Sequence, residues 1–222
     1  MTKLHLDDVR QAILDAALPH VAFDGWTRET LRRAAADAGI EPSVADLAFP
    51  RGPVTLLDLF ASEMDARMLE TLNAKDIESM RIRDRIICAV RTRLECLLPY
   101  REAERRAVGF LTLPPNAPLG LRLLGRTVDA MWRAAGDRST DFNYYTKRAL
   151  LAGVYSTTLA HWLQDESEGF EETWSFLGRR VEDVMQIQKL RGRFDSYVEK
   201  LPSPLGLLRS FKDRSGTSMR TR

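Results

Sequence analysis

Apolar residues along this chain recur at spacings of three and four, and no stretch alternates convincingly at a spacing of two. A three-to-four spacing places side chains on one face of an α-helix, whereas alternation is typical of a strand. The clearest case is residues 54–72, where apolar side chains follow in steps of four at Leu56, Phe60, Met64, Met68 and Leu72. The sequence therefore predicts an all-α protein, and its 222 residues suffice to bury a sizeable core.

Residues 1–52 are divided by proline and glycine into three short helical segments. Pro19-His20 and Asp24-Gly25 are expected to end the first helix, and Thr27 to cap the second by accepting a backbone hydrogen bond. Gly39 then separates the second helix from a short third one, which is the order of a helix-turn-helix unit. We expect these helices at residues 6–18, 28–38 and 42–48.

The pattern of this head resembles the head of the TetR repressor family. The matching residues are Trp26-Thr27-Arg28-Glu29, Ala35-Ala36, Gly39 and Leu47-Ala48-Phe49-Pro50. The resemblance implies a TetR-repressor-like fold, with the three-helix head (1–52) followed by a larger helical ligand-binding body (53–190).

The charge of the head argues against use on DNA. Residues 1–52 hold six Lys/Arg against eight Asp/Glu, and the third helix offers Ser43 and Asp46 but no basic residue. Contacts with phosphates and bases require cationic donors. We interpret the head as a structural unit, and a TetR-type ligand-responsive transcriptional regulator remains the alternative function.

The body is predicted to contain helices at residues 54–72, 77–98, 101–112, 140–164 and 169–188, with a further helix carrying Leu121 to Trp132. Arginines are frequent in the second of these helices. We interpret them as a solvated stripe, made by Arg81, Arg83, Arg85, Arg91 and Arg93.

A polar turn precedes the helix at 140–164. Gly136 closes the preceding helix because glycine tolerates the left-handed conformation, and Ser139, Thr140 or Asp141 can cap the next one. Packing alone does not require the aromatic and polar residues that crowd its first turn, namely Phe142, Asn143, Tyr144, Tyr145 and Arg148.

The turn also carries a longer resemblance. The run from Gly136 to Arg148, followed by Gln164-Asp165, Phe170-Glu171-Glu172-Thr173-Trp174 and Arg179-Arg180-Val181, is similar to the coenzyme Q biosynthesis accessory family, the ninth of the COQ genes. The similarity covers roughly residues 8 to 188. Members of that family are lipid-binding helical proteins with a TetR-like fold, and they are not enzymes.

The resemblance implies a function and a set of partners. The ligand would be an isoprenoid quinone intermediate or another lipid, presented to the late ubiquinone-pathway hydroxylase, and the eighth and ninth helices would form a homodimer. The partner-binding patch would comprise Asp141, Asn143, Tyr144, Tyr145 and Arg148. Asp141 as a helix cap and Arg148 as an intrahelical ion pair remain open alternatives.

Flexible and aromatic apolar residues in the body are candidates for lining the ligand. Methionine adapts its shape, and buried pockets are mostly apolar. We expect an enclosed apolar tunnel that opens near Tyr144, although each candidate is also compatible with an ordinary core. The candidates are Met64, Met68, Met131, Trp132, Tyr155, Trp162 and Trp174.

Residues 191–214 are predicted to be an amphipathic segment that docks on a membrane, because apolar faces are flanked by basic residues. Residues 189–222 hold nine Lys/Arg against three Asp/Glu, which favours an anionic surface. Folding back onto the body or onto another subunit is the alternative. The expected contacts are Phe194, Tyr197, Val198, Leu201, Leu205, Leu208 and Phe211, followed by a disordered tail at 215–222.

Motifs for catalysis, metals and cofactors are missing from the sequence. None of His5, His20 and His161 follows a glutamate by three positions, as in di-iron bundles. There is no Cys-x-x-Cys, no phosphate-binding glycine loop and no Gly-x-Ser-x-Gly elbow. We therefore expect no metal, no cofactor and no enzymatic activity. The first residues contain no apolar signal region, so we expect a cytoplasmic protein peripheral to the inner membrane.

Overall fold

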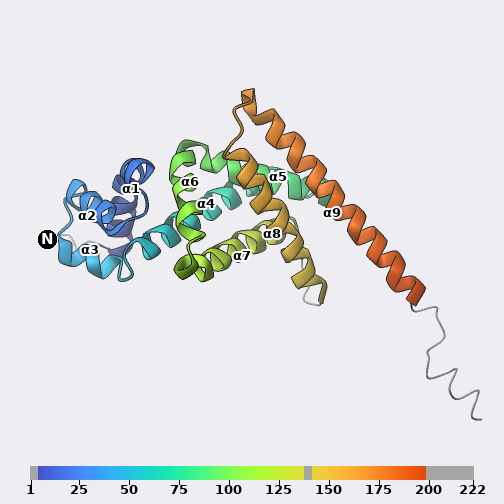
Figure 1. The fold of residues 1–222 in the computed structure, drawn as a ribbon, viewed down its shortest axis with the longest axis horizontal. Helices are drawn as coiled ribbons and strands as arrows, with labels where there is room; N and C mark the ends of the chain where they lie inside the picture. The colour runs from blue at the N-terminus through green and yellow to red at the C-terminus, as the bar shows by residue number, and fades with distance from the viewer. Residues whose placement is uncertain (1–4, 138–141, 199–222) are drawn as a thin grey trace, which may run out of the picture. The chain divides into compact units, whose positions relative to one another are not determined.

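The computed structural model describes residues 5–137 and 142–198, with residues 142, 143 and 187–198 as backbone only. All regular elements in this part of the chain are helices (Figure 1), which confirms the predicted all-α class. Contacts divide the chain into two compact units, the first ending at Val181 and the second beginning at Glu182. Within the described ranges, no helix has both the length and the apolarity required to cross a bilayer.

The head consists of α1 (Leu6–Asp24), α2 (Arg28–Asp37) and α3 (Pro42–Ala48). Thr27 caps α2 as predicted, because its hydroxyl accepts a hydrogen bond from the Thr30 backbone N–H at 3.0 Å. The prediction that Pro19 ends α1 is wrong. The helix continues because Val21 is fully buried one turn after Ala17, and this burial offsets the hydrogen bond that Pro19 cannot donate.

The body follows the head, and Figure 1 shows α4 running from the head into it. The apolar steps of α4 are confirmed, since all five side chains are at most 1% exposed. The bounds are α4 (Pro53–Asn73), α5 (Ile82–Leu97), η1 (Leu98–Tyr100), α6 (Arg101–Leu111), η2 (Pro114–Asn116), α7 (Ala117–Ala134), α8 (Phe142–Trp162), η3 (Glu168–Phe170) and α9 (Glu171–Val198).

The head is joined to the body through Trp26. Its indole N–H donates a 3.0 Å hydrogen bond to the Ala103 carbonyl of α6, and its ring centroid lies 5.3 Å from that of Phe60 on α4. A buried tryptophan needs such a partner for its N–H, so this contact fixes the connection between α1 and α2 of the head against two helices of the body.

Helix α9 differs from the predicted ninth helix because it continues without a break to Val198. The expected boundary between the body and the amphipathic segment therefore lies inside this helix. Of the predicted membrane contacts, Phe194, Tyr197 and Val198 belong to α9 as backbone, whereas Leu201, Leu205, Leu208 and Phe211 lie outside the described residues.

Candidate functional site

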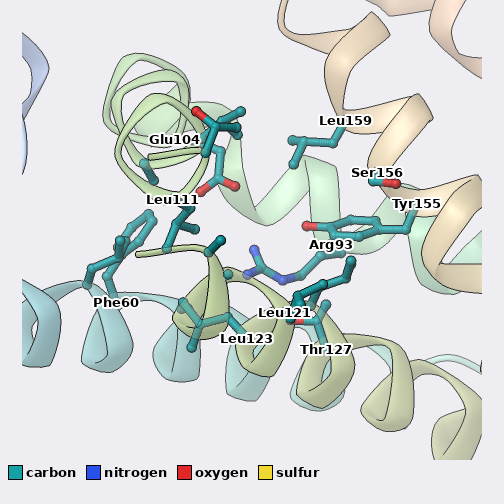
Figure 2. A pocket seen from close by; sticks show the side chains of 18 residues that line it. Phe60, Arg93, Glu104, Leu111, Leu121, Leu123, Thr127, Tyr155, Ser156 and Leu159 are labelled. Carbon is teal, nitrogen blue, oxygen red and sulfur yellow. The ribbon is translucent and has the colours of Figure 1, made fainter. Parts of the chain in front are cut away.

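A cavity of about 370 Å³ lies in the body, between α4, α5, α6, α7 and α8 (Figure 2). It reaches the surface at Leu121, whose side chain is 71% exposed. Most of the lining is aliphatic or aromatic, which suits an apolar ligand. The apolar part of the lining comprises Leu57, Phe60, Ala61, Ala107, Val108, Leu111, Ala117, Leu121, Leu123, Leu124 and Leu159.

A buried ion pair forms part of the cavity wall. The Arg93 guanidinium of α5 is 3% exposed, and its Nε donates to Asp65 Oδ1 of α4 at 3.0 Å. The same carboxylate accepts from Thr127 Oγ1 at 2.8 Å and from Arg126 Nε at 3.3 Å. Arg93 therefore does not belong to a solvated stripe, and the sequence-based prediction is wrong at this position.

Arg85 departs from the predicted stripe as well. Its guanidinium donates hydrogen bonds to the carbonyls of Ala135, Met80 and Glu78, and so connects the segment before α5 to the end of α7.

The end of α7 is as predicted. Gly136, which follows Ala135, has a φ of +87°, and this confirms that the glycine closes α7 in a left-handed conformation. The predicted caps Ser139, Thr140 and Asp141 lie outside the described residues.

Two further polar groups face Arg93 across the cavity. Figure 2 shows the Glu104 carboxyl of α6 and the Tyr155 hydroxyl of α8 pointing toward the Arg93 guanidinium. Removal from water raises the pKa of Glu104, and Arg93 only partly opposes this shift. Burial also raises the pKa of Tyr155, so its hydroxyl keeps its proton and remains a hydrogen-bond donor.

A second polar cluster holds the start of α8 against α7. Arg148 Nε donates to Asp129 Oδ1 at 2.8 Å, its guanidinium carbon lies 3.4 Å from the Tyr144 ring centroid, and its Nη1 is 3.3 Å from Asp137 Oδ2. The Tyr144 hydroxyl donates to the same Asp129 oxygen at 3.2 Å. Arg148 thus pairs between helices, and the intrahelical ion pair considered from the sequence is not what the structure shows.

Sequence comparison identifies the family to which this chain belongs. A family model described as COQ9 matches residues 117–188. The mitochondrial ubiquinone biosynthesis protein COQ9 of Rattus norvegicus is 36% identical over 222 residues, covering 96% of this chain and 71% of that protein. This chain belongs to the COQ9 family.

The COQ9 protein of Homo sapiens, also described as mitochondrial, gives the same 36% identity over 96% of this chain and 70% of its own length. Among solved structures, a TetR transcriptional regulator from Nitrosomonas europaea superimposes with a TM-score of 0.63, at 23% identity, over 80% of this chain and 98% of that one. This likeness confirms the predicted TetR-like fold, and at that identity it shows the fold alone.

The cavity of this COQ9 protein includes Tyr155 but none of the other candidate ligand-binding residues. Met64, Met68, Met131 and Trp162 are at most 1% exposed in the core, where they support the helices around the cavity. Trp132 donates to the Lys147 carbonyl at 3.1 Å, and Trp174 stacks beneath Arg91. The cavity also differs from the expected tunnel, because Tyr144 is not part of its lining, and the exposed side chains of the lining are those of Thr112, Leu121 and Ser156.

Sequence reasoning missed Arg93 and Glu104, although the spacing contained a signal. Arg93 continues the apolar register of Ile86, Val90 and Leu97, and Glu104 stands four residues before Val108. A charged residue in the apolar register of a helix is buried only with partners from other helices, and those partners are not visible in one helix's own sequence.

The residues of the predicted partner patch differ in exposure. Tyr144 and Arg148 are occupied with α7, whereas Tyr145 is 71% exposed, with its ring edge-on to Tyr144 at 5.1 Å between centroids. The side chains of Asp141 and Asn143 lie outside the described residues. Tyr145 is therefore the most exposed member of the predicted patch among the residues whose side chains are described.

The Asp165 carboxyl fixes the connection between α8 and α9. It accepts hydrogen bonds from the backbone N–H and hydroxyl of Ser167, at 2.8 and 2.6 Å, and from those of Thr173, at 2.9 and 2.5 Å. Although burial opposes ionisation, these donors lower the pKa of Asp165 below its ordinary value.

Replacing Asp165 with alanine is expected to lower the free energy of unfolding by about 1–3 kcal/mol, because buried donors of Thr173 lose their acceptor. The loss should be complete above the ordinary carboxyl pKa of about 4 and should shrink as the pH falls toward the lower folded pKa. Urea denaturation of the variant and of wild type at pH 7 measures the full loss of unfolding free energy, and the same experiment at pH 3.5 measures how far the loss has shrunk. The neighbouring Glu166→Ala variant, which removes an exposed carboxyl, should change stability by less than about 0.5 kcal/mol.

Proposed function

We propose that this COQ9 protein is a non-catalytic, lipid-binding accessory protein of ubiquinone biosynthesis. It would hold an isoprenoid quinone intermediate in the cavity and present it to the late ring hydroxylase. The observation that supports this most strongly is the largely apolar cavity that opens to the surface at Leu121. Each buried carbon of an isoprenoid tail contributes about 0.8 kcal/mol, so even two isoprene units bind usefully.

The relatives support a role of this chain in ubiquinone biosynthesis, since the proteins from rat and human are both named as ubiquinone biosynthesis proteins. An intermediate with a long tail resides in a membrane, so its carrier has to work at the membrane surface. We propose that residues 191–214 dock there, that the protein is peripheral to the inner membrane on its cytoplasmic side, and that α8 and α9 form a homodimer.

The TetR-like fold does not favour transcriptional regulation. In α3, the exposed polar side chains are Ser43 and Asp46, and an exposed Leu47 lies beside them. A helix that reads the major groove needs donors for bases and cations for phosphates. The head is better explained as a structural unit joined to the body through Trp26.

The proposed function is tested with the purified late hydroxylase and a polyprenylphenol substrate embedded in liposomes. Adding the wild-type chain should accelerate product formation. The Tyr145→Ala variant should lose at least about tenfold of this effect, because exposed aromatic residues often anchor interfaces. Its thermal stability should be unchanged, since the side chain is exposed.

The matched control is Leu113→Ala, which removes another exposed apolar side chain away from the patch and should keep the full effect. A wild-type chain that leaves the hydroxylase rate on liposomes unchanged would contradict the proposed function. A Tyr145→Ala variant as active as wild type would contradict the role of Tyr145 alone.

A further inference from the structure

One hydrogen-bonding group of the buried Arg93 is left unused. Its Nε is paired with Asp65, but Nη1 has no hydrogen-bond partner among the described residues, and the side chain is 3% exposed. Buried donors without partners are rare and costly in folded proteins, particularly when they are charged. Arg93 lines the cavity, so an oxygen atom of a ligand bound beside its guanidinium would supply an acceptor that the described residues do not.

The groups facing Arg93 have unused hydrogen-bonding capacity as well. The Tyr155 hydroxyl and the Glu104 carboxyl point into the cavity (Figure 2), and neither has a side-chain hydrogen bond within residues 5–137 and 142–186. Three polar groups on three different helices thus converge on one place in a largely apolar space. Such an arrangement orients a ligand by its polar end, while the apolar wall supplies affinity.

The charges around this place are balanced, which limits the kind of ligand. Asp65 already pairs with Arg93 and Arg126, and Asp58 pairs with Arg126 and Arg122. Glu104 contributes a third carboxyl to these three guanidinium groups. An anionic head group would therefore find these guanidinium groups already paired with carboxylates, and it would be desolvated beside Glu104.

We propose that Arg93, Glu104 and Tyr155 form the head-group site of the cavity, and that this site takes a neutral, hydroxyl-bearing ring attached to an isoprenoid tail. A phenol matches the three groups because its oxygen has two lone pairs, which accept from Arg93 and from the Tyr155 hydroxyl, and its proton is donated to Glu104. The volume of about 370 Å³ lies at the small end of ligand pockets, so it holds a ring and the start of a tail, and the remaining tail leaves past Leu121. This inference rests on the proposed function.

The test compares three probes by titration calorimetry on the delipidated full-length protein: 3-geranylphenol, geranylbenzene, which lacks the hydroxyl, and 3-geranylbenzoic acid, which is anionic. The wild-type chain should bind the phenol about tenfold more tightly than geranylbenzene, and the benzoic acid more weakly than the phenol. In Tyr155→Phe and in Glu104→Gln, phenol affinity should fall by about threefold to tenfold while geranylbenzene affinity is unchanged.

Both variants keep the shape of the side chain and change a group with no side-chain hydrogen bond to the described residues, so both should fold, and circular dichroism should show the helix content of wild type. Equal affinity of the wild-type chain for the phenol and geranylbenzene would overturn the head-group site while lipid binding stands. Tighter binding of the benzoic acid than of the phenol would also overturn it. If neither the phenol nor geranylbenzene binds, both the head-group site and the proposed lipid-binding function are contradicted.

Discussion

Replacing Asp65 with alanine should lower the free energy of unfolding by about 3–5 kcal/mol, the largest single-site loss that we expect in this protein. The variant removes the acceptor for Arg93, Arg126 and Thr127 at once. Arg93 is 3% exposed, so its guanidinium would remain buried without a counter-charge. Guanidinium chloride denaturation followed by circular dichroism measures the loss.

The matched control is Asp58→Ala on the same helix. Asp58 pairs with Arg122 and Arg126 nearer the surface, where water can replace the lost carboxylate, so we expect a loss of about 1 kcal/mol or less. Equal losses for Asp65→Ala and Asp58→Ala would contradict the view that the ion pair of Arg93 is a buried structural support of the cavity.

The second large effect is expected from filling the cavity. Leu124 lines it from α7, and Leu124→Trp introduces an indole into space that a ligand would otherwise occupy. We expect the amount of lipid extracted from the purified protein to fall by at least about tenfold, since about 1.4 kcal/mol of lost binding energy suffices for that factor. Solvent extraction and quantitative mass spectrometry of the lipid measure it.

Gly125→Trp is the control for this variant. The glycine is exposed on the same helix, does not line the cavity, and a Cβ added there meets nothing within 4 Å. Its lipid content should equal that of wild type. If Leu124→Trp retained as much lipid as Gly125→Trp, the ligand would have to bind elsewhere.

Much of the fold was predictable because local signals and burial agree. In α4, apolar residues in steps of four produced a buried face as expected, and Thr27 and Gly136 act as predicted at the ends of their helices. Local rules failed where tertiary packing outweighs them. Burial of Val21 carries α1 past Pro19, although proline is the strongest local signal for a helix end.

The site was predictable only in part. Residue type suggested that methionines and tryptophans would line a ligand, but of the candidates only Tyr155 does so. Arg93 was assigned to the surface because it is charged, although its register in α5 is apolar. What determines its burial is Asp65, 28 positions earlier on another helix, and such a pairing is a property of the assembled body.

The central claim, that the cavity binds a neutral isoprenoid lipid, is tested most directly by native mass spectrometry of the full-length protein purified without detergent. We predict a bound species whose mass, after release, matches a polyprenylated ring with a neutral oxygen-bearing head, present in wild type and Gly125→Trp and depleted in Leu124→Trp. The claim would be contradicted if the wild-type protein carried no lipid. It would also be contradicted if the Leu124→Trp variant carried as much of the same lipid as wild type.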